Sequence, residues 1–213
     1  MDEDLQSYLR PTEFIESAAE PIVALARSLA RGTERETAIA LFDWVRDRVK
    51  YDPYAAVDPR GRYRATAVLE RGRGYCVQKA VLLAALGRAA GIPTRLGFAD
   101  VRNHKSPPKM LELMGTNLFV FHGFVEFYLE GQWVKATPAF DEATSRKAGV
   151  LPVALDGEND AMFHPVDPEG HPFIEYVRSR GTHADLPFDE LRRTLLEAYG
   201  GARRDAGDGG HGA

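Results

Sequence analysis

Cys76 is the only cysteine of this 213-residue chain, and its place in the sequence is unusual. It follows a glycine-broken stretch, RGRGY at residues 71–75, and an apolar helical pattern begins directly after it. Unpaired N–H groups at a helix N-terminus favour an anion, so the pattern predicts a thiol with a lowered pKa that acts as a nucleophile. The same N–H groups could stabilise an oxyanion. The alternative is a buried structural cysteine, because free cysteines are among the most buried residues.

A cysteine nucleophile needs a histidine base within hydrogen-bond reach. Of the six histidines, His122 is the one that lies inside a strand-like pattern. Strand alternation predicts that it shares a face with Val120 and Phe124, and that Phe119 points to the opposite face. Gly123 leaves room beside it for a ligand or another backbone. The alternative is a strand histidine without a catalytic role.

Asp141 is the candidate third group, which would orient the imidazole. Residues 119–137 are predicted to form a β-hairpin with its turn at Glu130–Gly131. That pairing would place His122 opposite residue 139 or 140, close to Asp141. The alternative is an aspartate that begins a solvated loop.

Periodicity predicts the elements that must position these residues. A helix apolar nearly all round is predicted over about Cys76–Ala90, and such a helix is buried in the middle of a domain. Two helices precede it, and strands follow it, so we expect an α+β fold with an antiparallel sheet. The other predicted elements are a helix from about Pro21 to Gly32, a helix from the Thr33–Glu36 capping box, a strand over 94–103, a loop or short helix over 104–115 and a surface helix over 186–200.

These elements indicate one domain over residues 1–199, with a core of about 21–141 and a C-terminal extension over 142–199. The glycine-rich segment 200–213 has little to bury and is predicted to be disordered.

Composition limits the remaining possibilities. The formal net charge is −4 with scattered Lys and Arg, which argues against nucleic-acid binding. One cysteine excludes an intramolecular disulfide and a multi-cysteine metal site. The acidic N-terminus is unlike a signal peptide, and no run approaches the roughly 20 apolar residues of a membrane span. We therefore expect a soluble cytoplasmic protein with no membrane partner. No phosphate-binding loop is found and the acid-rich segment 156–164 lacks calcium-loop spacing, so no cofactor or metal is expected. Nothing indicates an oligomeric state.

Two blocks of the sequence resemble the transglutaminase-like superfamily, a papain-like group of cysteine enzymes. The first is a Gly-x-Cys that opens a buried helix and a Gly-Ile-Pro-x-Arg that starts a strand. The second is a strand histidine followed by an aromatic, acidic hairpin, and segment 44–54 is similar to the helix before this core. The resemblance covers about residues 21–141. The matching positions are Gly74, Cys76, Gly91, Ile92, Pro93, Arg95, His122, Glu126, Gly131 and Trp133.

The resemblance implies a triad in which Cys76 attacks, His122 is general base and acid, and Asp141 orients the imidazole. The sequence departs from the family pattern at one place. Many members have Asp-Pro-Thr about four residues after the hairpin tryptophan, and here that position reads Thr137-Pro138. Either the loop brings Asp141 into the same space, or the third position is Thr137 or vacant.

A thiolate, a base and an oxyanion site predict acyl transfer on a peptide or protein amide through a thioester. By analogy with the family, hydrolysis by a protease or amidase is favoured over transamidation. Tyr51 and Tyr54 are candidates for a second oxyanion donor, with packing as the alternative. Three other interpretations stay open: an inactive scaffold that binds peptides or proteins, an arylamine acetyltransferase-type enzyme that uses coenzyme A, and an unrelated α+β domain.

Overall fold

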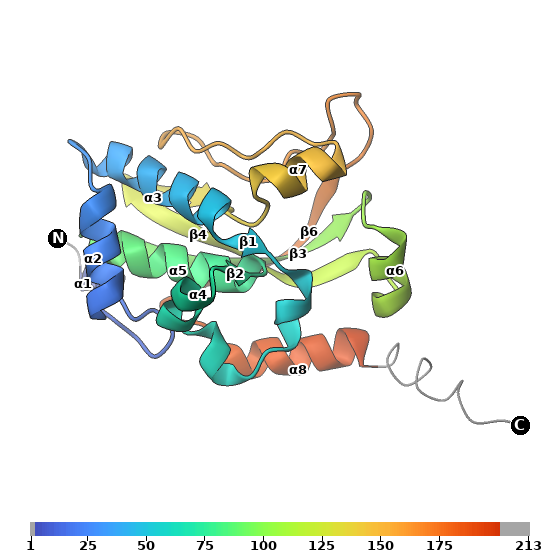
Figure 1. The fold of residues 1–213 in the computed structure, drawn as a ribbon, viewed down its shortest axis with the longest axis horizontal. Coiled ribbons are helices and arrows are strands. Elements are labelled where there is room, and N and C mark those ends of the chain that lie inside the picture. The colour runs from blue at the N-terminus through green and yellow to red at the C-terminus, as the bar shows by residue number, and fades with distance from the viewer. Residues whose placement is uncertain (1–2, 201–213) are drawn as a thin grey trace, which may run out of the picture.

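The computed structural model describes residues 3–200. It has an α+β fold in which helices cover a four-stranded antiparallel sheet of order β5-β4-β3-β6 (Figure 1). A small parallel pair, β1-β2, lies beside it. The elements are α1 (Glu3–Ser7), α2 (Glu20–Leu29), α3 (Glu34–Arg48), β1 (Lys50–Tyr51), η1 (Pro53–Val57), η2 (Arg60–Tyr63), α4 (Ala65–Arg71), β2 (Arg73–Gly74), α5 (Cys76–Ala89), β3 (Thr94–Asn103), α6 (Pro108–Met114), β4 (Leu118–Leu129), β5 (Gln132–Ala136), α7 (Glu142–Ala148), β6 (Ile174–His183) and α8 (Phe188–Tyr199).

Helix α5 is the centre of the fold, as its lack of a polar face predicted. Every residue from Cys76 to Arg88 is buried. Burial of the charged Lys79 is tolerated because its ammonium donates to the carbonyl oxygens of Arg46 and Val49, at 2.9 and 2.6 Å. These carbonyls belong to the C-terminal end of α3, so one buried side chain both caps α3 and ties it to α5.

The predicted N-terminal helical layer is confirmed. Helices α2 and α3 pack on α5, and α3 begins with the expected capping box, in which Thr33 Oγ1 accepts from the Glu36 N–H and a Glu36 carboxylate oxygen accepts from the Thr33 N–H. Helix α2 ends at Leu29, earlier than the glycine at position 32 suggested.

The predicted hairpin is also confirmed, with β4 and β5 joined at Glu130–Gly131. Both turn residues have positive φ, 50° and 92°, as a type I′ turn requires. Strand β3 has the predicted bounds, Thr94–Asn103.

One feature of β4 was not predicted: a bulge beside His122. Ala99 of β3 pairs with His122, but Val101 pairs with Phe119, so β4 carries one extra residue in between. Phe121, within the bulge, has a φ of 57°. The bulge moves Phe119 onto the His122 face, and the prediction that the two point to opposite faces was wrong.

The sequence analysis did not predict α4, α7 and the edge strand β6, nor the short elements α1, β1, β2, η1 and η2. Strand β6 pairs with β3, but most of its residues are exposed and charged or polar, so it lacks apolar alternation. The tail predicted to be disordered lies outside the described residues, apart from Gly200. Within residues 3–200, none of the helices combines the length and apolarity needed to span a membrane.

Candidate active site

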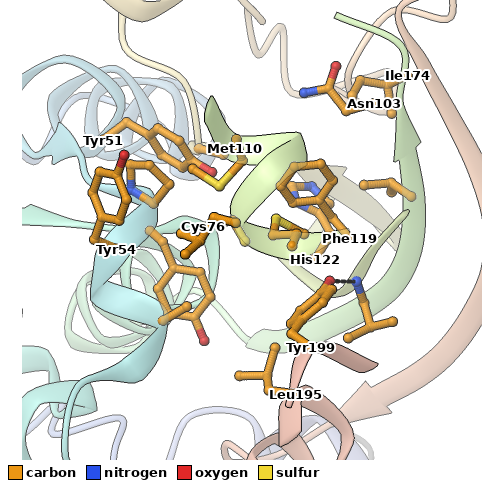
Figure 2. A pocket seen from close by; sticks show the side chains of 18 of the residues that line it. Tyr51, Tyr54, Cys76, Asn103, Met110, Phe119, His122, Ile174, Leu195 and Tyr199 are labelled. Atoms are coloured by element: carbon orange, nitrogen blue, oxygen red, sulfur yellow. Dashed lines mark hydrogen bonds between the residues drawn. The ribbon is translucent and has the colours of Figure 1, made fainter. Parts of the chain in front are cut away.

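Cys76 and His122 line the same cavity, which encloses about 200 Å³ (Figure 2). Its walls come from segments far apart in the chain: the β1–η1 segment, the start of α5, β3 and β4, and the helices α6 and α8. Most of the lining side chains are aliphatic or aromatic. The two residues that the sequence singled out for chemistry are therefore brought to one apolar cavity.

Gly123 lets the nucleophile helix approach the histidine strand. A Cβ atom at this position would lie 2.8 Å from Val77 Cα, a distance that real Cβ atoms essentially never show. The first turn of α5 therefore packs directly on the main chain of β4. Because Gly123 follows His122 and Val77 follows Cys76, this contact brings the main chains of the two candidate residues close together. The sequence prediction that Gly123 admits another backbone is confirmed.

The expected lowering of the Cys76 pKa is not found. Burial raises the pKa of the thiol to about 11, and the N–H groups of Gly123, Val77 and Cys76 itself lower it by less. The helix N-terminus favours the thiolate as predicted, but Cys76 is only 8% exposed, and desolvation of the thiolate raises the pKa by more than the N–H groups lower it. The thiol is therefore neutral at pH 7.

His122 is also neutral at pH 7, because burial lowers its pKa to about 4. Its ring packs against Phe163 and Tyr176, with centroids 5.3 and 6.2 Å away. Its Nε2 atom lies 3.1 Å from Thr137 Oγ1. When Nε2 carries the proton and donates to this hydroxyl, Nδ1 is left as an unprotonated base.

Thr137, not Asp141, contacts the imidazole. Thr137 follows β5 directly and is 1% exposed. The two oxygens of Asp141 are engaged elsewhere: Oδ1 accepts from the Thr144 N–H and caps α7, and Oδ2 accepts from the Tyr51 N–H at 3.0 Å. Of the residues considered for the third position of the triad, Thr137 is therefore the one that contacts His122. Asp141 contacts the main chain of Tyr51 instead.

The bulge before His122 is held by side chains from two other elements. The buried carboxylate of Asp100 on β3 accepts from the Phe121 N–H at 3.1 Å and is ion-paired with Arg180 on β6. The Tyr199 hydroxyl on α8 accepts from the Val120 N–H at 2.8 Å (Figure 2). These bonds compensate for the positive φ of Phe121 and hold the main chain directly before His122.

Tyr51 places its hydroxyl in the cavity, whereas Tyr54 lies at the edge of the cavity. The ring of Tyr51 points into the cavity (Figure 2), and its hydroxyl makes no hydrogen bond with the described residues. Burial raises its pKa well above 10, with the nearby Cys76 as a further cause. The phenol therefore stays protonated and can donate. Tyr54 is 52% exposed at the cavity edge.

One group of side chains among the described residues has the spacing to hold a metal ion, and it lies outside the cavity. It consists of Asp167, Glu169 and His171. The Asp167 carboxylate already accepts from two backbone N–H groups and is ion-paired with Lys105 at 2.6 Å. We assign no metal to it.

Sequence reasoning missed how α6 and α8 contribute to the cavity. Helix α8 was predicted as a surface helix, but it presents Leu195 and Tyr199 to the cavity. These two residues and Leu191 recur at helical spacing, so the apolar face was visible in the sequence, although its partner was not.

A helix that opens with cysteine, packed on an antiparallel strand that carries histidine, defines a papain-like α+β protein. Residues 23–138, more than half of the chain, match the transglutaminase-like superfamily, and the chain belongs to this family. The resemblance seen in the sequence is thereby confirmed.

One solved structure agrees at the level of the fold. A "putative cysteine protease" from Cytophaga hutchinsonii is 19% identical with a TM-score of 0.51 over 87% of this chain. A "putative protease" from Parabacteroides distasonis is 18% identical with a TM-score of 0.39 over 76% of this chain. This chain spans only 48% and 31% of the length of those two proteins. A search of curated proteins finds no match.

Proposed function

We propose that this protein is a cysteine-dependent acyl-transfer enzyme that cleaves an amide or peptide bond through a thioester on Cys76. The observation that carries the proposal is the placement of Cys76 and His122 in one apolar cavity, with their main chains in contact at Gly123. The family, and the description of a structural neighbour as a cysteine protease, support a peptide substrate.

In the proposed reaction, the first step moves one proton and forms one bond. The Cys76 sulfur attacks the substrate carbonyl carbon while its proton passes to His122 Nδ1. The negative charge then lies on the former carbonyl oxygen, where the Cys76 N–H and the Tyr51 hydroxyl are the proposed donors. The C–N bond breaks as the imidazolium returns its proton to the leaving amine, which leaves the acyl group on sulfur.

The second step is the reverse of the first with a new nucleophile. Water, or another amine, attacks the thioester as His122 accepts its proton, and the thiol leaves protonated. Water yields an acid and an amine yields a new amide. We favour water, because a solved structure of this fold is described as a putative cysteine protease, and a protease transfers the acyl group to water.

Thr137 makes this proposed pair different from a triad with a carboxylate. A hydroxyl can fix the imidazole tautomer through Nε2, but it carries no charge to stabilise an imidazolium. Both groups are neutral at pH 7, so proton transfer must accompany attack instead of preceding it. Asp141 acts one contact further away, by holding the main chain of Tyr51.

Activated esters test the proposal, because they acylate a nucleophile whatever its preferred leaving group. We expect p-nitrophenyl acetyl-phenylalaninate to give a burst of p-nitrophenolate and to add one acyl group to Cys76 by mass spectrometry. Cys76→Ala abolishes the burst, and His122→Gln slows it at least 100-fold. His171→Gln, an exposed histidine outside the cavity, leaves it unchanged. Turnover with added glycine amide then separates hydrolysis from transamidation by the mass of the product.

A peptide-binding scaffold without catalysis is the second candidate. It is favoured by the raised thiol pKa and by the hydroxyl in place of a carboxylate. Under this alternative the ester leaves Cys76 unmodified, while peptides still shift the NMR signals of cavity residues.

A further inference from the structure

The cavity contains one charged side chain that no residue within the described range 3–200 neutralises. Among the described residues that line it, Arg192 of α8 is the only one charged at neutral pH, since the other titratable groups are His122, Cys76 and tyrosines. Arg192 is half-buried and makes no ion pair or hydrogen bond with a described residue. A guanidinium has five donors in a planar fork that matches a carboxylate.

The rest of the cavity is apolar, and its mouth exposes apolar side chains. Leu113 of α6 is 41% exposed and Leu196 of α8 is 59% exposed, and both line the cavity. Clustered, exposed apolar side chains around a cavity mark a surface that is covered when a ligand binds. Met110, Phe119 and Leu195 continue this surface toward His122 (Figure 2).

Helix α8 sets the spacing between the two features. Arg192 lies seven residues before Tyr199, whose hydroxyl contacts β4 at Val120, two residues before His122. Seven residues of helix rise about 10 Å, which corresponds to about two extended residues of a bound peptide and the length of a glutamate side chain. Arg192 also acts electrostatically on Tyr63, whose hydroxyl contacts that of Tyr75 next to Cys76.

We infer that the acyl segment of the substrate carries a large apolar side chain next to the reacting carbonyl and a carboxylate about two residues away that binds Arg192. This rests on the proposed function, because it assigns the two groups to the segment that acylates Cys76. The apolar group fills the space between α6 and α8. The carboxylate supplies the negative charge that the described residues do not.

Peptide chloromethyl ketones test this by alkylating the cysteine at a rate that depends on the fit of the peptide. Three probes are compared: acetyl-Glu-Ala-Phe, acetyl-Gln-Ala-Phe and acetyl-Glu-Ala-Ala chloromethyl ketone. The second-order rate of Cys76 modification is followed by mass spectrometry. We expect the probe with Phe to react roughly 10- to 100-fold faster than the probe with Ala. We expect Glu to react about fivefold faster than Gln.

Variants on α8 separate the two contacts. Arg192→Gln abolishes the preference for Glu and keeps that for Phe, whereas the exposed neighbour Arg193→Gln keeps both. Leu196→Ala reduces the preference for Phe, and Leu151→Ala, which is equally exposed outside the cavity, does not. Thermal melting shows whether each variant is folded.

The outcomes distinguish the inference from the proposed function. Three equal rates, all well above that of iodoacetamide, would overturn the inference and leave the nucleophile in place. Probes that modify Cys76 no faster than iodoacetamide would overturn both. A preference for Glu that survives in Arg192→Gln would remove the carboxylate from the inference.

Discussion

Replacing Thr137 by aspartate would give His122 the charged partner that this site lacks. The Thr137 hydroxyl lies 3.1 Å from Nε2, so a carboxylate at the same position reaches the ring nitrogen. We expect Thr137→Asp to raise the pKa of His122, because an adjacent negative charge favours the imidazolium.

The size of the effect follows from the wild-type site. Burial is the cause that lowers the pKa of His122 to about 4. A carboxylate within hydrogen-bond distance raises a pKa by about one to three units, which would place His122 between about 5 and 7. At about 1.4 kcal/mol per unit, the imidazolium gains about 1.4 to 4 kcal/mol. Thr137→Val, which keeps the shape and the burial, should leave the pKa near its wild-type value.

NMR titration of the histidine ring C–H signals measures the pKa, with His122→Gln used to assign the signal. Thermal melting establishes that Thr137→Asp is folded. A His122 that titrates near 6.5 in the wild-type protein would refute the reasoning at its first step. A folded Thr137→Asp protein with an unchanged His122 pKa would refute the second. If the aspartate prevents folding, the wild-type and Thr137→Val titrations still decide whether burial alone sets the pKa.

Three further predictions concern stability and the geometry of the site. The pKa of His122 is lower in the folded protein than in the unfolded chain, so the unfolded chain binds more protons below pH 6.5. The free energy of unfolding, measured in urea melts, should therefore fall by about 3 kcal/mol between pH 6.5 and pH 4. The same fall in His122→Gln would contradict this. Gly123→Ala should cost about 1–3 kcal/mol and slow acylation of the thiol, because the new Cβ meets the first turn of α5. Gly61→Ala, where a Cβ meets nothing within 4 Å, should change neither, and equal effects of the two would disprove the close approach. Asp100→Asn should cost about 3 kcal/mol because it breaks a buried ion pair beside the bulge. Glu175→Gln, in an exposed ion pair on the same sheet, should cost less than about 1 kcal/mol, and similar losses would show that the bulge needs no charged support.

The elements with strong local signals were predictable from the sequence. Helix α5 has no polar face, α3 begins with a capping box, and the turn at Glu130–Gly131 separates two apolar strands. In each case the information lies within a few residues, so no knowledge of the remaining fold was needed. Cys76 and His122 could be selected for the same reason, because one opens a helix and the other lies in a strand.

Features that depend on distant residues could not be predicted. The bulge at Phe121 places a non-glycine residue at positive φ, and its support comes from Asp100 on another strand. The pKa of Cys76 depends on how deeply the N-terminus of α5 is buried. The local sequence indicates that the thiol lies at a helix N-terminus, but it does not indicate the depth of burial. The choice between Thr137 and Asp141 was likewise set by where the chain turns after β5.

The contact at Gly123 is made by main chain, and this separates the spacing of Cys76 and His122 from the side chains that line the cavity. No large side chain stands between the helix that carries the sulfur and the strand that carries the imidazole, so their spacing does not depend on what lines the remainder of the cavity. Substitutions on α6 and α8 can therefore change the shape of the cavity while Cys76 and His122 keep their relative positions. Such a division allows a protein to acquire new substrates by gradual change along two peripheral helices.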